Sequence, residues 1–146
     1  MPGIERAHVL LVNEREAQLL TGADDPAEAA RRLGELIPRV VVTLGAGGAV
    51  ELDGGELVRA EGVRCQAVDT TGAGDLFAAA YVWADLAGAG PYDRLRWAVL
   101  YASLSVGVST AVAGAATLEG LVEAGARFGL TPPAGGQSLT IEEEAR

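Results

Sequence analysis

The residues with the clearest chemical potential lie in one short segment, DTTGAGDLF, at residues 69–77. Two glycines flank a small residue there, where a loop leads into a long apolar run that is typical of a helix. The first backbone N–H groups of a helix have no partner within it. Those of Gly72, Ala73 and Gly74 are therefore predicted to form an anion site that needs no basic side chain.

Asp75 follows directly and falls in the first turn of this predicted helix. A carboxylate is repelled by a phosphate bound beside it, so its presence favours a chemical role over simple binding. That role is the removal of a proton from an incoming hydroxyl, as the catalytic aspartate of protein kinases does. The local sequence leaves a second interpretation open, in which Asp75 is an ordinary acidic residue favoured by the helix dipole.

Composition limits how the chain can hold an anion. It carries 11 Lys and Arg against 20 Asp and Glu, a net charge of -9, which argues against a nucleic-acid partner. A single cysteine, Cys65, leaves no internal disulfide, and the start MPGIERAHVLLV is unlike a secretory signal, so a cytoplasmic location is expected. Residues 97–118 are uncharged but interrupted by Ser, Thr and Gly, which favours a buried helix and a turn over a membrane span.

The elements that must position these residues alternate along the chain. Apolar runs at 7–12 and 39–44 suit buried parallel strands, and helical patterns occupy 13–22 and 25–36. A hairpin is predicted from 49–52 and 56–59 around Asp53-Gly54-Gly55, and helices at 73–88, 91–110 and 118–128. This order indicates an α/β sandwich with a mainly parallel sheet, which binds ligands at the carboxyl ends of its strands. We expect residues 1–130 to form the folded part and 131–146 a flexible tail.

Two other nucleotide-binding motifs are incomplete. A dinucleotide fingerprint needs a third small residue, but Val50 stands there after Gly45-Ala46-Gly47, and Phe77 stands there after Gly72-Ala73-Gly74. The chain also has no G-x-x-x-x-G-K-[ST], which excludes a P-loop NTPase.

The segment D-T-T-G-A-G-D-x-F closely resembles the C-terminal signature of ribokinase-like carbohydrate kinases, the PfkB family. NEREAQLLTG (13–22) is similar to the family's N-x-x-E segment, and VVTLGAGG (41–48) to its T-L-G-x-x-G nucleotide loop. A small-residue helix ending in GA follows, so the resemblance covers about 9–115 in the family's order. It implies the C-terminal, nucleotide-binding half of a three-layer α/β/α sandwich with a mainly parallel sheet. The implied activity is ATP-dependent phosphoryl transfer to a hydroxyl of a sugar or sugar-like substrate.

The resemblance also implies roles at the matching positions. Asp75 would be the base, and the amides of Gly72, Ala73 and Gly74 the anion hole. Asn13 and Glu16 would lie near the phosphates and help to organise Mg²⁺, in part through waters. The nucleotide would be lined by Thr43, Leu44, Gly45, Ala46, Gly47 and Gly48.

Two further positions match less closely defined sites of the family. Asp69 and the carbonyl of Thr71 resemble its site for a monovalent cation such as K⁺. Ser103 matches a position that touches the adenine, where other members often carry Asn or His.

Each role has a plainer alternative. Asn13 could simply end a strand, Glu16 could be a solvated helix residue, the GAGG loop could be only a turn, and Asp69 could cap a turn through Thr71. Family members are much longer, and their N-terminal half supplies the sugar pocket and the lid. The alternative function is therefore a catalytically silent fragment or a nucleotide-binding regulatory module.

The expected partners are a small-molecule sugar and ATP, with no nucleic acid and no membrane. We also expect either a homo-oligomer or a need for the missing N-terminal half. The sequence does not name the acceptor, because ribose, fructose phosphates, keto-deoxy sugars and nucleosides are all used within the family.

Overall fold

The computed structural model describes residues 8–62, 73–106, 118–127 and 129–133 of the 146. The chain divides into two compact units, Met1–Arg64 and Cys65–Arg146. The first unit contains strands β1 (Val9–Asn13), β2 (Arg39–Thr43), β3 (Ala49–Asp53) and β4 (Glu56–Ala60), helices α1 (Glu14–Thr21) and α2 (Pro26–Gly34), and the 3-10 turn η2 (Gly45–Gly47). The second contains α3 (Ala73–Leu86), α4 (Pro91–Val106) and α6 (Leu118–Arg127).

The helices of the first unit begin and end where local chemistry requires. Helix α1 stops at Gly22, whose φ of 74° lies in the left-handed region that glycine adopts without a steric penalty. Helix α2 starts after Asp25, whose carboxylate accepts a 3.1 Å hydrogen bond from the Glu28 amide, and Pro26 occupies the first helical position. The end of α1 and the start of α2 both agree with the sequence prediction.

The sheet has the order β1-β2-β3-β4. Strands β1 and β2 are parallel, whereas β3 is antiparallel to both β2 and β4. The α/β class and the hairpin are confirmed, but the described strands form a mixed sheet and not a mainly parallel one. The reason is the short link between β2 and β3, since parallel neighbours need a crossover of a dozen or more residues.

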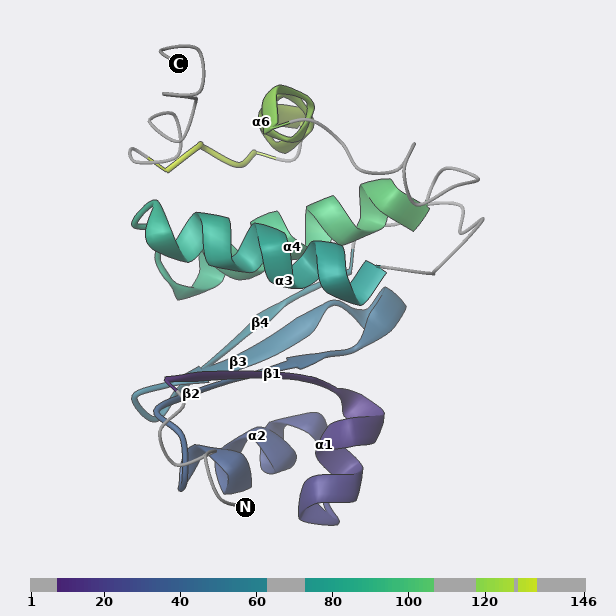
Figure 1. Ribbon diagram of the computed structural model, residues 1–146, viewed down its shortest axis with the longest axis vertical. Helices are drawn as coiled ribbons and strands as arrows, with labels where there is room; N and C mark the ends of the chain where they lie inside the picture. The colour runs from purple at the N-terminus through teal and green to yellow at the C-terminus, as the bar shows by residue number, and fades with distance from the viewer. Residues whose placement is uncertain (1–7, 63–72, 107–117, 128, 134–146) are drawn as a thin grey trace, which may run out of the picture. The chain divides into compact units, whose positions relative to one another are not determined.

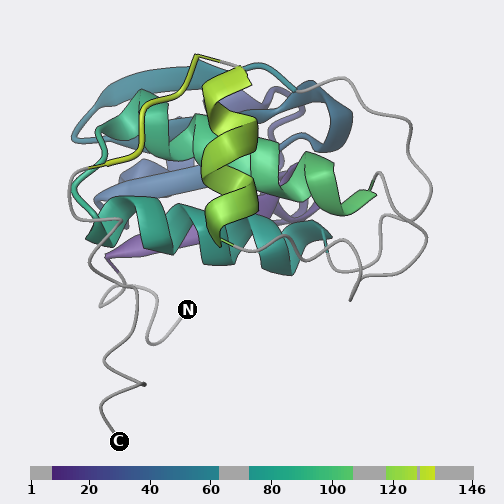
Figure 2. The ribbon, with the colours of Figure 1, turned by 90° about the horizontal axis from the view of Figure 1, so that it is seen from above.

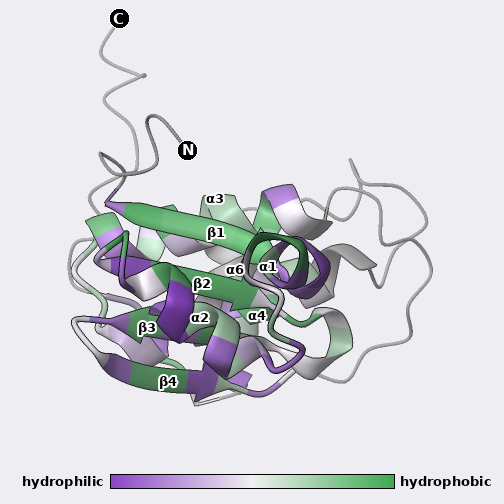
Figure 3. Cartoon of the chain, turned by 90° about the horizontal axis from the view of Figure 1, so that it is seen from below, coloured by the Kyte–Doolittle hydropathy of each residue, from purple (hydrophilic) through white to green (hydrophobic). Residues whose placement is uncertain are grey.

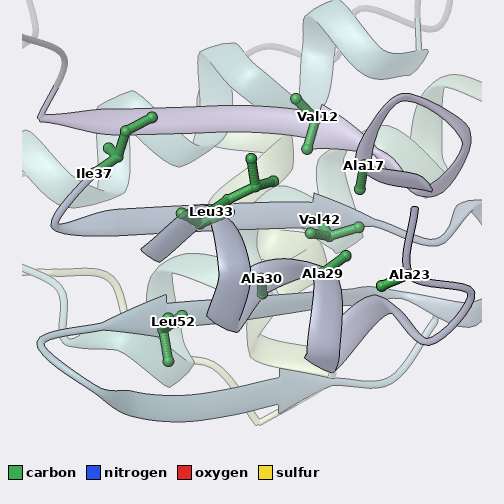
Figure 4. Close-up of a cluster of buried hydrophobic side chains, with 10 residues drawn as sticks. Val12, Ala17, Ala23, Ala29, Ala30, Leu33, Ile37, Val42 and Leu52 are labelled. Carbon is green, nitrogen blue, oxygen red and sulfur yellow. The ribbon is translucent and has the colours of Figure 1, made fainter. Parts of the chain in front are cut away.

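Helices α1 and α2 cover one face of this sheet (Figure 1). Their apolar residues pack on alternating positions of the strands, with Val12, Val40, Val42 and Leu52 among those buried (Figure 4). Ala29, Ala30 and Leu33 supply the α2 side, and alanines there let the helix lie close to the strands. Figure 3 shows β1 and β2 to be apolar along most of their length, whereas α2 carries hydrophilic residues away from the sheet.

The second unit consists of helices packed around aromatic side chains. The rings of Trp83 in α3 and Trp97 in α4 meet edge to face, with their centroids 5.5 Å apart. Helix α6 lies across α4 (Figure 2) at Gly125, where a Cβ atom would overlap the Trp97 indole. Arg94 of α4 is buried, 3.2 Å from Asp85 of α3 and over the ring of Tyr81. These contacts fix how α3 lies on α4.

The remaining predictions fall partly outside the described residues. Helix α4 is described to Val106, so the turn expected after it is not covered, and neither is most of the tail, 134–146. Within the ranges that the structure describes, no helix is long and apolar enough to cross a membrane.

Candidate functional site

One edge of the sheet of the first unit gathers the residues that the sequence singled out there. The strand register aligns Asn13 of β1 with Thr43 of β2, Thr43 with Ala49 of β3, and Ala49 with Ala60 of β4. This row contains the carboxyl ends of the two parallel strands, which is where ligands bind in α/β sheets. The candidate site therefore contains one aligned residue from each of the four strands. The start of α1, the loop after β2 and the chain after β4 adjoin this row.

Asn13 and Glu16 contact each other at the start of α1. The Asn13 Oδ1 atom accepts a 2.8 Å hydrogen bond from the Glu16 amide, and the Asn13 amide donates a 3.0 Å bond to Glu16 Oε2. This reciprocal pair is a capping box, which satisfies two amides that the helix leaves unpaired. Both side chains are exposed, and Asn13 Nδ2 and Glu16 Oε1 take no part in the capping box. The pair thus has a structural role and retains polar atoms for a ligand.

The predicted nucleotide loop follows β2 directly. Thr43 donates a long, 3.5 Å hydrogen bond to the Val12 carbonyl, and Leu44 closes the loop with a 2.9 Å bond from its amide to the Gly48 carbonyl. Gly45 and Gly48 have φ values of 58° and 93°, which disfavour any residue with a side chain. Gly45, Ala46 and Gly47 are exposed, so backbone at the tip of the loop is accessible.

The predicted catalytic segment lies in the second unit. Helix α3 begins at Ala73, and Asp75 is exposed in its first turn, as the sequence predicted. Gly74 is also exposed, and a Cβ atom built on it would meet nothing within 4 Å. Among the residues that the structure describes, none would obstruct a side chain at Gly74, and Asp75 follows it directly in the first turn.

Ser103 lies in the last part of α4 and is half-buried. Its hydroxyl donates a 2.7 Å hydrogen bond to the Val99 carbonyl one turn earlier. A hydroxyl bonded in this way satisfies its own donor within the helix. An adenine at this position would therefore meet the oxygen of Ser103 as an acceptor.

Other predicted site residues are not covered. Gly72, Asp69 and Thr71 lie outside the described residues, so the predicted anion hole is described only from Ala73 onward and the predicted monovalent-cation site is not described. Among the residues that the structure does describe, no group of three or more His, Cys, Asp or Glu could hold a metal ion. Mg²⁺ usually keeps several waters and binds substrate phosphates through one or two carboxylates, and Glu16 fits that pattern.

The structure adds one residue that the sequence patterns did not indicate. Gly62, two residues beyond the end of β4, approaches the backbone of Ala46 in the nucleotide loop so closely that a Cβ atom would overlap the Ala46 carbonyl oxygen. A glycine shortly after a strand is the only local signal, and it does not reveal which backbone lies opposite.

Comparison with known proteins gives a consistent result. The model of the pfkB family of carbohydrate kinases matches residues 1–118. A curated relative, the 2-dehydro-3-deoxygluconokinase of Thermoproteus tenax, is 39% identical over 102 residues, which are 68% of this chain and 31% of that protein. The chain thus spans about a third of the length of such relatives.

Solved structures agree with this assignment. Arabidopsis thaliana ribokinase complexed with ribose and ATP superposes with a TM-score of 0.77 at 30% identity, covering 83% of this chain and 41% of that one. An E. coli protein described as a ribokinase II, in complex with ATP and Mg²⁺, gives a TM-score of 0.77 at 26% identity over 85% of this chain and 41% of that one. The ribokinase-like α/β fold expected from the sequence is confirmed.

Proposed function

This chain belongs to the pfkB family of carbohydrate kinases, and from that membership we propose that it takes part in phosphoryl transfer from ATP to a hydroxyl of a sugar or sugar-like substrate. The observation that carries the proposal is the position of Asp75. It is exposed in the first turn of α3, directly after the open backbone at Gly74.

Asp75 accepts the proton of the attacking hydroxyl in this proposal. The hydroxyl oxygen forms a bond to the γ-phosphorus of ATP, the bond from that phosphorus to the bridging oxygen breaks, and ADP leaves. The amides of Gly72, Ala73 and Gly74 donate hydrogen bonds to the charge that spreads over the transferring group. An Asp at a helix start suits this task because its carboxylate is held near the anion without being bound to it.

The nucleotide side of the site is assigned to the edge of the sheet in the first unit. The loop Thr43–Gly48 lines the nucleotide, and its exposed glycines allow the ligand to approach the backbone. Asn13 and Glu16 orient the waters around Mg²⁺ through the atoms that the capping box does not use. When bound, Mg²⁺ neutralises phosphate charge. Asp69 and Thr71 retain their assignment to a monovalent cation such as K⁺.

The second candidate function is that of a nucleotide-binding regulatory module or catalytically silent fragment, which uses the loop Thr43–Gly48 and needs no base at Asp75. The acceptor sugar is not identified in either case.

Two measurements on the 146-residue chain separate these functions. Calorimetric titration with ATP, with and without Mg²⁺, tests the nucleotide site, and we expect binding that requires the metal. ADP release across a panel of sugars and nucleosides, with an N-terminal half of a family member supplied in trans, tests transfer. ATP binding without turnover under any of these conditions supports the regulatory module, and no ATP binding refutes both functions.

A further inference from the structure

The nucleotide loop is in contact with the chain that leaves β4. Ala60, the last residue of β4, pairs with Ala49, the first residue of β3, and the loop 45–48 immediately precedes Ala49. The two residues after Ala60 therefore pass along the same edge of the sheet as the loop. Sheet register, and not sequence proximity, brings these two segments together.

The contact between the segments is made by backbone on both sides. A Cβ atom on Gly48 would overlap the Ala60 carbonyl oxygen and come within 2.7 Å of the Glu61 carbonyl carbon and the Gly62 nitrogen. In return, a Cβ atom on Gly62 would overlap the Ala46 carbonyl oxygen and lie 2.8 Å from the Ala46 carbonyl carbon. It would also lie 3.2 Å from the Gly48 nitrogen. Backbone atoms cannot move aside by changing rotamer, so a side chain here must push the loop and the chain after β4 apart.

Gly62 differs from the loop glycines in the reason for its small size. Gly45 and Gly48 have positive φ values, which by themselves favour glycine. Gly62 is not among the described glycines with positive φ, so its backbone conformation would accept other residues. Only the close approach of Ala46 explains why a side chain is excluded.

From these contacts we infer that Gly62 is a positioning residue for the nucleotide loop. Because Gly62 has no side chain, the Ala46 carbonyl lies against the chain that leaves β4, and this contact sets the position of Gly45, Ala46 and Gly47 at the edge of the sheet. The inference rests on the proposed function, because it assumes that this loop binds the nucleotide.

The test compares Gly62→Ala with a control that perturbs the same unit elsewhere. Gly34 is suitable, because a Cβ atom there would overlap the Leu52 side chain. Leu52 lies near the edge of the sheet opposite the loop, since β3 begins at Ala49. We expect Gly62→Ala to weaken ATP binding about tenfold or more in calorimetry, the equivalent of about 1.4 kcal/mol. Gly34→Ala should leave ATP affinity in calorimetry within about twofold of the parent's. This should hold even if Gly34→Ala lowers the melting temperature as much as Gly62→Ala does.

Equal ATP affinity of folded Gly62→Ala and the parent would overturn the inference. Failure of the parent itself to bind ATP is a different result, since it refutes the proposed function. In that case the amide NMR resonances of Gly47 and Gly48 still decide the positioning role: they should shift in Gly62→Ala and stay in place in Gly34→Ala.

If Gly62→Ala does not fold, the contact can be measured in the unmodified chain. The Gly62 Hα protons should show nuclear Overhauser contacts with the Gly48 amide, because a Cβ atom on Gly62 would lie 3.2 Å from the Gly48 nitrogen. Their absence in an assigned spectrum would show that the loop is not held at this position.

Discussion

Asn13 and Thr43 are paired directly across the parallel strands β1 and β2, and each is the last residue of its strand. Asn13 begins the capping box of α1, whereas Thr43 begins the loop that ends at Gly48. One register position thus brings together the start of a helix and a glycine-rich loop. The predictions below test how far this edge and the start of α3 act in phosphoryl transfer.

Asp75→Asn tests the proposed base. In a catalytically active fusion of this chain to the N-terminal half of a family member, we expect kcat to fall by about 10²- to 10⁴-fold, the usual contribution of a positioned base. ATP affinity should stay the same or rise slightly, because a charge that repels phosphate is gone. Steady-state kinetics with the best sugar of the panel provides the measurement.

Asp93→Asn is the matched control, because Asp93 is also exposed and lies in the first turn of α4. It should lose the same small dipole stabilisation and keep its kcat. If the two variants behave alike in turnover, Asp75 is an ordinary helix-start residue.

Gly74→Ala separates the stability of α3 from phosphate binding. A Cβ atom there meets nothing within 4 Å, and alanine is the better helix former by about 1 kcal/mol. The melting temperature should therefore hold or rise, whereas ATP affinity should fall because the methyl group crowds the approach to the amides. If ATP affinity and melting temperature both rise in Gly74→Ala, the start of α3 is not part of the phosphate site.

Glu16→Gln separates capping from metal organisation. Glutamine can accept the same hydrogen bond from the Asn13 amide, so unfolding free energy should change little. Loss of the carboxylate should raise the Mg²⁺ concentration needed for half-maximal ATP binding, which a metal titration measures.

Glu28→Gln is the control for this variant, since Glu28 occupies the corresponding third position of α2 and its ion pairs are exposed. It should leave the Mg²⁺ requirement unchanged. If Glu16→Gln needs the same Mg²⁺ concentration as the parent, Glu16 acts only as a capping residue.

The 146-residue chain alone should be inactive as a kinase and should self-associate. Orientation of the hydroxyl can supply about 7–11 kcal/mol of a barrier reduction, and the matched motifs account for the nucleotide side only. Among the described strands, β1 pairs on one side only, with β2, and Leu19 of the adjacent α1 is 77% exposed. Unpaired strand edges of this kind favour association between chains.

Light scattering coupled to size exclusion tests the association, and ADP release tests the activity. We expect oligomers or aggregates and background rates, with turnover recovered when an N-terminal half is supplied. Sugar-dependent turnover by a monodisperse monomer would mean that the acceptor site lies within these residues.

The sequence by itself determined the features that depend on neighbouring residues. Asp25 and Pro26 mark the start of α2, Gly22 marks the end of α1, and Asp53-Gly54-Gly55 forms the hairpin turn, because caps and turns act over a few residues. The order of the motifs identified the family, and the placement of Asp75 in the first turn of α3 followed from the glycines before it.

Only the tertiary structure decided which distant residues meet. The alignment of Asn13 with Thr43 and the contact of Gly62 with Ala46 depend on how segments distant in sequence pair, which the residues around each position do not specify. Arginine is rarely buried unless it is paired, and Arg94 is buried against Asp85 and Tyr81, which only the packing of α3 on α4 brings together. The physical reason is the same in each case: burial and close backbone approach are set by segments far apart along the chain, so they exist only once those segments have packed.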